Sequence, residues 1–324
     1  MPKVSFILPA YKRRFLYEAI DSILAQTYQD FELIVVDDCS PENLNEIVDR
    51  FQDERLSYYR NEINIGGKDL VAAWNKALAY ANGEWVVCAG DDDIYDPDFL
   101  TEMLALSRKY PTVDVFHCRI GIIDASGRIL RLGRPRAEFE RPIEFIYHSS
   151  VDRLEQRIPD FLYRRKVLCS YGGYVHSPRA WYSDIMTSIV MSLERGAVFS
   201  NRFLLFWRSS GENISCKIDD VPDKIEATVR FLTEIEVITS SLKPFGRDEQ
   251  LLLEEIKSKV EKVALDSLWG YWSRMPFIQA TKVLSNSRLP VSVRKAWHRI
   301  RLRQELGPTR LFSRVRQMIG WLKR

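Results

Sequence analysis

The chain has 324 residues, of which 46% are hydrophobic and 28% are charged, with 47 Lys and Arg against 44 Asp and Glu. This length suits one large domain with an appendage, or two domains, and the apolar fraction excludes a wholly disordered chain. No apolar stretch approaches the ~18–20 residues that span a bilayer, and the first residues lack the pattern of a signal peptide. These features predict a protein made in the cytosol that is soluble or attached to a membrane surface.

The cysteines and histidines give little support to a disulfide framework or a zinc site. The five cysteines are scattered and lack C-x-x-C spacing, and the four histidines form no H-x-x-x-H or H-E-x-x-H pattern. We therefore expect reduced thiols.

The first third of the chain alternates β-rich and amphipathic segments. Strands are expected over residues 4–10, 31–36, 56–60 and 85–89. Helices are expected over residues 15–24, 42–51 and 68–81 and after Pro97. Repeated β-α units require crossover connections, which predicts a mostly parallel sheet with helices on both faces. Ligands of such sheets bind beyond the carboxyl ends of the strands.

Polar groups follow three of these strands at that edge, namely Pro9-Ala10-Tyr11, Asp37-Asp38 and Asp91-Asp92-Asp93. An acidic triplet alone is weak support for a site, because a solvated loop is the better explanation of an isolated triplet. This triplet, however, follows a strand too apolar to be exposed, and mutual repulsion makes clustered carboxylates costly unless a cation is present. Mg²⁺ is usually held by one or two carboxylates together with substrate phosphates. The pattern predicts a metal-bound diphosphate, and the P-loop and dinucleotide-binding fingerprints do not occur.

Taken together, residues 4–11, 26–40, 64–66 and 83–97 resemble the family 2 glycosyltransferases, which are inverting enzymes with the GT-A fold. The resemblance is strong over about residues 3–105 and patchier to about residue 215. Within the family it is closest to bacterial polysaccharide-assembly members such as the spore coat polysaccharide type.

The resemblance implies an α/β chain organised in three parts. A GT-A catalytic domain is expected over residues 1–215, with a nucleotide half over about 1–110 and an acceptor half over about 111–215. A helical region over 216–287 and a basic amphipathic tail over 288–324 follow.

The resemblance also assigns roles by position. Asp38 is expected to accept a hydrogen bond from the uracil imide, and Asp91 to lie near the ribose. Asp92, with Asp93, is expected to bind Mn²⁺ or Mg²⁺, although the division of roles within the triplet stays open because Gly90 stands where some members carry the first Asp. The remaining nucleotide-binding candidates are Pro9, Ala10, Tyr11 and Lys68, and a solvated side chain is the alternative for the lysine.

An inverting transfer needs a carboxylate that takes the proton of the acceptor hydroxyl. The family places this acid at the start of a helix in its second half, which points to Asp184. An aspartate that stabilises the helix N-terminus is the alternative interpretation. The competing acids are Asp152, Asp160 and Glu194. The expected acceptor-binding residues are Gly173, Trp181 and Tyr182, with core packing as the alternative for the two aromatic residues.

Two arginine-containing segments carry weaker expectations. Arg208 is a candidate for assisting the diphosphate. The segment 127–144 carries five arginines and resembles a variable acceptor-side loop that could hold a phosphate-bearing acceptor, with solvated charge as the alternative.

The tail over 288–324 carries eleven Lys or Arg and a single acid, Glu305. A basic helix with Trp and Phe on its apolar face suits an anionic membrane surface. A helix that forms a homodimer is the alternative, and nucleic acid is disfavoured because no reading motif accompanies the charge.

The sequence thus predicts a metal-dependent inverting glycosyltransferase. Its partners would be a nucleotide-sugar, expected to be a UDP-sugar, and a glycan or polyprenyl-linked glycan acceptor in surface polysaccharide synthesis. It would be cytoplasmic, with peripheral attachment at the inner face of the cell membrane. The alternatives are a nucleotidyltransferase that makes a nucleotide-sugar, and a non-catalytic subunit that binds sugar-nucleotides or glycans.

Overall fold

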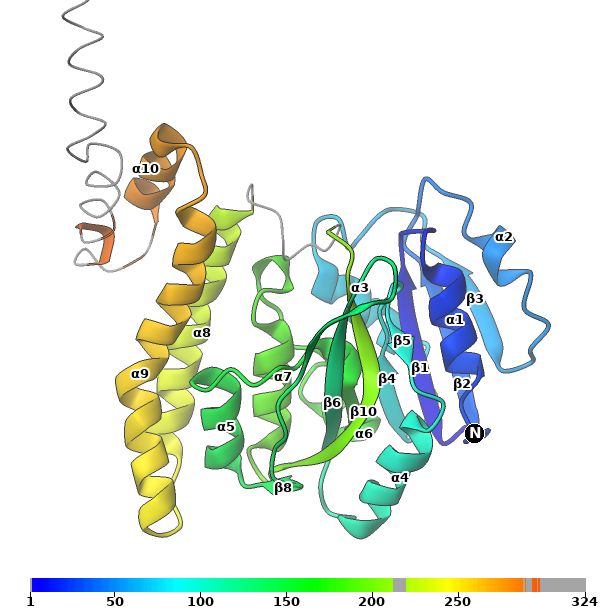
Figure 1. Cartoon of the computed structure of the whole chain (residues 1–324), viewed down its shortest axis with the longest axis horizontal. Coiled ribbons are helices and arrows are strands. Elements are labelled where there is room, and N and C mark those ends of the chain that lie inside the picture. Colours follow the sequence, from blue (N-terminus) through cyan, green and yellow to red (C-terminus); the bar gives the residue numbers. More distant parts are fainter. Residues whose placement is uncertain (1, 212–219, 288, 290–292, 296, 298–324) are drawn as a thin grey trace, which may run out of the picture.

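A computed structural model describes residues 2–211, 220–287, 289, 293–295 and 297. These residues form a ten-stranded sheet, helices against both of its faces, and a pair of long helices beside it (Figure 1). The strands are β1 (Val4–Ala10), β2 (Phe31–Asp37), β3 (Leu56–Arg60), β4 (Trp85–Cys88), β5 (Ile94–Tyr95), β6 (Val115–Asp124), β7 (Ile129–Leu132), β8 (Phe139–Glu140), β9 (Phe161–Arg164) and β10 (Ala197–Ser209).

The α-helices are α1 (Leu16–Leu24), α2 (Asn45–Val48), α3 (Leu70–Leu78), α4 (Phe99–Lys109), α5 (Pro142–Ser150), α6 (Arg165–Ser170), α7 (Ser183–Ser192), α8 (Val221–Ser241), α9 (Gly246–Trp272) and α10 (Phe277–Asn286). Two short 3₁₀ helices, η1 (Ile158–Asp160) and η2 (Pro178–Ala180), complete them. The helix predicted over 42–51 is shorter in the structure, where only the single turn of α2 is helical. The predicted strands at 4–10 and 56–60 coincide with β1 and β3.

The sheet runs in the order β3-β2-β1-β4-β9-β6-β10-β5. The first four strands are parallel, as the β-α repeats predicted, and Ile7 of β1 is in register with Ile34 on one side and Cys88 on the other. Beyond β4 the sheet is mixed, because β9 is antiparallel to both β4 and β6. The carboxyl ends of β1, β2 and β4 therefore meet at one edge.

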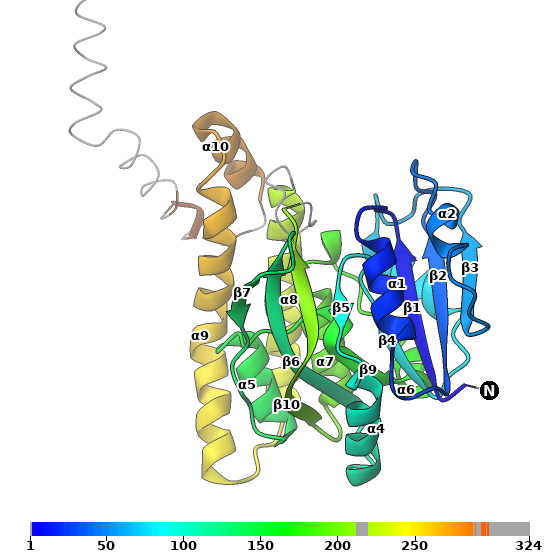
Figure 2. The same ribbon diagram turned by 45° about the vertical axis from the view of Figure 1, so that its right-hand side comes forward.

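Side chains alternate between the two faces of the strands and build two cores. In β1, Phe6 and Leu8 join the core that α1, α2 and α4 cover, whereas Ile7 joins the core under α3, α5 and α7. The second core continues into α8 and α9, which stand next to α5 and α7 (Figure 2). The expected helices on both faces are thus confirmed, and the long helices share their core with the sheet. The division at residues 215 and 216 stays a prediction.

A third apolar cluster lies at the N-terminal end of α8 and the C-terminal end of α9. Trp272 and Leu268 pack there with Leu289 and Trp297. Most of the predicted basic tail lies outside the described residues. Among the helices that the structure describes, none is both long and apolar enough to cross a membrane.

Candidate active site

A cavity of about 880 Å³ opens at the carboxyl ends of β1, β2 and β4. The strand side of its wall includes Pro9, Ala10, Tyr11, Lys12, Asp38, Gly66, Trp74, Asp91, Asp92 and Asp93. The rest of its lining comes from later segments of the chain and includes Arg131, Arg153, Glu155, Gln156, Arg157, Arg179, Trp181, Tyr182, Asp184, Trp207, Lys224 and Tyr271. Residues from two of the three predicted parts, the catalytic domain and the helical region, thus meet in one cavity.

Asp37 and Asp38, at the end of β2, face different surroundings. Asp37 is fully buried and binds the Tyr58 hydroxyl at 2.6 Å and the Arg60 guanidinium, so it holds β2 and β3 together. The Asp38 carboxylate faces the cavity and accepts hydrogen bonds from the amides of Ile65 at 3.0 Å and Gly66 at 2.6 Å.

The glycine at position 66 suits this close approach. A Cβ atom there would lie 3.0 Å from Asp38 Oδ2, so that carboxylate would have to shift by a few tenths of an ångström. The side-chain amide of Asn61 also donates to Asp38, at 2.7 Å, and the three hydrogen bonds fix the carboxylate and leave part of its acceptor capacity unused.

The three aspartates after β4 are held by backbone amides and by Lys12, which Asp91 and Asp92 share. Asp91 Oδ2 accepts hydrogen bonds from the amides of Tyr11 at 3.0 Å and Lys12 at 2.9 Å. The Lys12 ammonium lies 2.5 Å from Asp92 Oδ2 and 3.2 Å from Asp91 Oδ1. Asp93 is buried and accepts from the Arg208 amide at 2.9 Å. Backbone and side-chain donors therefore gather three negative charges at one strand end.

Burial dominates the electrostatics of this cluster. It raises the pKa of Asp92, against the opposing charge of Lys12, and it raises the pKa of Asp93 further, with the charge of Asp92 adding to the effect. Burial alone would lower the pKa of Lys12, but the charges of Asp91 and Asp92 outweigh it and raise that pKa instead. Lys12 is therefore a firmly protonated counter-ion of the triplet.

Arg208, a candidate for contact with the diphosphate, lies behind the triplet. Its guanidinium bonds the Glu18 carboxylate at 2.6 Å and the Asp92 carbonyl oxygen at 2.8 Å, and it does not line the cavity. In this structure Arg208 supports the aspartate loop from inside.

Asp184 lies in the first helical turn of α7 and lines the cavity. The turn of the chain just before this helix has a strained backbone. Arg179, Ala180 and Tyr182 all have positive φ, between 53° and 69°. Arg179 ties this turn to the start of α8 through Asp220 at 3.0 Å and Asp223 at 2.9 Å.

The carboxylate of Asp184 is half-buried and accepts a hydrogen bond from the Ile185 amide at 2.8 Å. Burial raises the pKa of Asp184, and the charges of Arg157 and Arg153 oppose that rise. A carboxylate with a raised pKa at a cavity wall has the properties of a general base.

Most of the predicted site residues meet in the cavity. Those that line it are Pro9, Ala10, Tyr11, Asp38, Asp91, Asp92, Asp93, Trp181, Tyr182 and Asp184. Lys68 is exposed and not part of the cavity lining. Gly173 is also outside the lining, and its role in the structure is steric, because its φ is +92° and a Cβ would lie 2.3 Å from Asn75 Oδ1. The binding roles of Lys68 and Gly173 remain predictions, because neither residue lines the cavity.

The competing acids lie elsewhere. Asp152, Asp160 and Glu194 are absent from the residues that line the cavity, and Asp160 is fully buried beside His117. Of the four acids that the sequence offered as the base, Asp184 is the one that lines the cavity.

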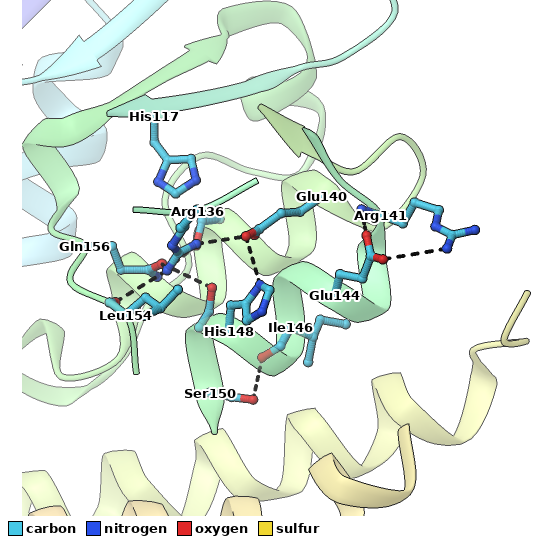
Figure 3. Close-up of polar contacts among 12 residues, drawn as sticks. His117, Arg136, Glu140, Arg141, Glu144, Ile146, His148, Ser150, Leu154 and Gln156 are labelled. Carbon is cyan, nitrogen blue, oxygen red and sulfur yellow. Dashed lines mark hydrogen bonds and ion pairs between the residues drawn. The ribbon is translucent and has the colours of Figure 1, made fainter. Parts of the chain in front are cut away.

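A buried polar network supports one wall of the cavity (Figure 3). Arg136 lies 3.4 Å from Glu140 Oε2, and it also donates to the Leu154 carbonyl and to Gln156 Oε1, each at 3.4 Å. Glu140 in turn bonds His148 at 2.8 Å. Sequence reasoning expected segment 127–144 to be an acceptor-side or solvated loop, but its Arg136 is buried and holds residues 154–156 in place.

Several cavity residues were not found from the sequence. Lys12 follows a predicted pocket residue directly, so its position was a usable signal. Lys224 and Tyr271 lie on α8 and α9, and Arg153 and Arg157 lie on a loop without a motif. Only tertiary packing brings these four residues to the cavity.

The cavity contains donor atoms of the type that Mg²⁺ and Mn²⁺ prefer, namely carboxylate oxygens. Among the described residues, no group of three His, Cys, Asp or Glu side chains is arranged to hold a metal ion. An ion at Asp92 would therefore need further oxygen ligands from a bound diphosphate, and Lys12 would have to move.

Comparisons with known proteins identify relatives in several bacteria. The putative colanic acid biosynthesis glycosyl transferase WcaA of Escherichia coli is 37% identical over 114 residues, which are 34% of this chain and 40% of that protein. An uncharacterized glycosyltransferase of Rickettsia typhi is 27% identical over 197 residues, 58% of this chain and 60% of that protein. The matched segments thus span 40 to 60% of the length of these relatives.

Solved structures match over nearly the whole chain and confirm the expected GT-A fold. Staphylococcus aureus TarS 1–349 in complex with UDP has a TM-score of 0.61 at 18% identity, covering 93% of this chain and 89% of that one. The mannosyltransferase PcManGT of Pyrobaculum calidifontis, in complex with GDP-Man and Mn²⁺, has a TM-score of 0.56 at 17% identity, covering 93% and 84%. The sequence model of glycosyl transferase family 2 matches residues 5–173, more than half of the chain, and the chain therefore belongs to that family.

Proposed function

We propose that the chain is a metal-dependent, inverting glycosyltransferase that moves a sugar from a UDP-sugar to a hydroxyl of a glycan or lipid-linked glycan in surface polysaccharide synthesis. The observation that carries the proposal is that Asp38, the triplet and Asp184, from distant parts of the chain, line one cavity. Membership of the family and the relative named for colanic acid biosynthesis support it.

In this proposal the strand side binds the donor. Asp38, held by the amides of Ile65 and Gly66, accepts a hydrogen bond from the uracil imide, and Asp91 lies near the ribose. Pro9, Ala10 and Tyr11 form the wall against the nucleotide. The complexes of TarS with UDP and UDP-GlcNAc, and of PcManGT with GDP-Man, support a nucleotide-sugar as the donor.

Asp92, with Asp93, would hold Mn²⁺ or Mg²⁺ together with diphosphate oxygens. When bound, the cation supplies positive charge to the leaving diphosphate. Asp184, across the cavity from the triplet, removes the proton of the acceptor hydroxyl as that oxygen attacks the anomeric carbon. Trp181 and Tyr182 lie beside Asp184 and contact the acceptor sugar.

The basic tail over 288–324 suggests where in the cell the protein acts. With eleven basic residues over 288–324, peripheral attachment to an anionic membrane surface, at the inner face of the cell membrane, fits a lipid-linked acceptor. A homodimer formed through the tail is the alternative.

A thermal-shift panel of UDP-, GDP- and dTDP-sugars, each with and without Mn²⁺, tests the donor assignment. A ligand that binds the folded state raises the free energy of unfolding by RT ln(1 + [L]/Kd), so a tight donor stands out by about 3 kcal/mol at a hundredfold excess over Kd. We expect UDP-sugars to stabilise the protein only with the metal and Asp38→Ala to remove the preference for uracil. Equal stabilisation by all bases, or by none, would contradict the assignment.

A further inference from the structure

Two sets of residues that line the cavity differ in charge, and we call each set an end of the cavity. The strand end carries Asp38, the triplet and Lys12, whereas the end formed by β7, the 153–159 loop, the 179–185 turn, α8 and α9 carries mostly basic side chains. The basic residues of this second set are Arg131, Arg153, Arg157, Arg179 and Lys224, and its acids are Glu155 and Asp184. The second set therefore has an excess of positive charge among the described residues that line the cavity.

Lys224 is held rigidly at this end. It lies in the first turn of α8, is 1% exposed, and places its ammonium 3.9 Å from the centre of the Tyr271 ring and 5.0 Å from that of Trp181. The rings of Trp181 and Tyr271 meet edge to face at 5.2 Å. Aromatic faces attract a cation. Because Trp181 precedes Asp184 by three residues, this cluster borders the candidate base.

Two arginines flank the same region and are positioned by neutral groups. Arg153 has a φ of 49° and donates to the Ser267 hydroxyl on α9. Arg157 donates to the Gln156 carbonyl at 2.6 Å and lies over the Trp207 ring at 4.9 Å. By contrast, Arg131 pairs with Glu155, and Arg179 with Asp220 and Asp223. The hydrogen bonds that orient Arg153 and Arg157 come from neutral groups, and Asp184 is the lining acid whose pKa both arginines lower.

A neutral sugar would remove water from Arg153 and Arg157 without adding a counter-charge, which is costly in a partly enclosed site. An anionic group would instead form charge-assisted hydrogen bonds with them, and such bonds are the stronger kind.

We propose that Lys224, Arg153 and Arg157, with the rings of Trp181 and Tyr271, form a cationic subsite that binds an anionic group of the acceptor, either a phosphate or a carboxylate. This inference rests on the proposed function and specifies its acceptor class. It gives α8 and α9, which lie outside the region that matches the family model, a direct part in choosing the acceptor.

The test uses the full chain saturated with UDP and Mn²⁺, so that the strand end is filled. Calorimetry then compares three probes, methyl glucoside, methyl glucuronide and glucose 6-phosphate. We expect one or both anions to bind at least about tenfold more tightly than the neutral sugar, as one charge-assisted bond would give. The tighter of the two anions shows whether a carboxylate or a phosphate is preferred.

Two variants locate the effect. Lys224→Met keeps the length and apolar contacts of the side chain, and Arg153→Gln changes an exposed side chain that tolerates substitution. Each should reduce the preference for the anion at least about threefold, because each removes one charge-assisted bond, while the Kd for UDP stays unchanged. Lys259→Met, on the exposed face of α9, is the matched control and should keep the full preference.

The outcomes separate the two proposals. Equal binding of neutral and anionic sugars, no binding of either anion, or a preference that survives in both variants would overturn the cationic subsite and leave the donor assignment intact. A failure of UDP itself to bind would contradict the proposed function instead. If circular dichroism shows that Lys224→Met does not fold, the preference of Arg153→Gln for the anion decides whether the cationic subsite exists.

Discussion

Lys12 places its ammonium between the carboxylates of Asp91 and Asp92, at 3.2 Å and 2.5 Å. Asp92 is also the residue proposed to hold the divalent cation. Two positive charges cannot share one carboxylate cluster at this distance without strong repulsion. The lysine and the metal are therefore expected to compete, and Lys12 must leave Asp92 when the ion binds.

Lys12→Met should strengthen the binding of Mn²⁺ in the presence of saturating UDP, whose diphosphate would supply the further oxygen ligands. The substitution removes the internal competitor while keeping the length of the side chain, so we expect the Kd to fall about tenfold or more. A Mn²⁺ titration followed by electron paramagnetic resonance measures it. Lys3→Met, at the opposite end of β1 and paired with Glu84 on the surface, is the control. Unchanged or weaker Mn²⁺ binding in Lys12→Met would show that the two cations do not compete.

Asp184→Asn should separate donor binding from transfer. The amide keeps the shape of the side chain but cannot take the acceptor proton, so transfer should slow at least about a hundredfold. Binding of UDP should stay within a factor of about two of the wild-type value, because the contacts proposed for UDP are with other lining residues, Asp38 and the triplet. Asp152→Asn, an exposed acid outside the cavity lining, serves as the control. Normal turnover in Asp184→Asn would assign the base to another residue.

The pH dependence of kcat follows from the same residue. A general base works only when deprotonated, so kcat should rise with pH through the raised pKa of Asp184 and then level off. Arg157 opposes that rise in pKa, and Arg157→Gln should therefore move the acidic limb of the profile to higher pH. Arg128→Gln, at a surface turn with its side chain 83% exposed, should leave the limb in place. A shift to lower pH in Arg157→Gln would contradict the assignment.

The donor side of the site was predictable because local pattern determines it. Apolar strands such as β1 and β4 are recognisable by composition, and parallel pairing brings their carboxyl ends to one edge whatever the details of packing. The position of Asp38 and of the triplet follows from strand order alone. The pattern could not show the partner of each carboxylate. The contact of Lys12 with the triplet depends on the conformation of the lysine side chain, which the sequence does not specify.

The acceptor side was less predictable because packing between distant segments builds it. Arg136 belongs to the segment 127–144, whose sequence is also compatible with a solvated loop. In the structure, Arg136 is buried and contacts Glu140 and the 154–156 segment. Lys224 and Tyr271 lie 47 residues apart on two helices whose apolar spacing predicts helices but not which faces meet. The contact of Lys224 with Tyr271 depends on how α8 and α9 dock, which no local pattern specifies.

Truncation within the basic tail tests membrane attachment without exposing the core. Leu289 and Trp297 pack against Trp272, so removal of all residues after 287 would uncover that cluster. A chain ending at Trp297 keeps the packing and removes eight of the eleven basic residues of the tail. In vesicle flotation, we expect the full chain to bind vesicles with anionic lipid, more weakly at high salt, and the truncated chain to lose most of this binding, because each basic residue near the surface contributes about 1 kcal/mol. Uncharged vesicles are the control. Equal binding by both chains, with a change from dimer to monomer in light scattering, would assign the tail to dimerisation instead.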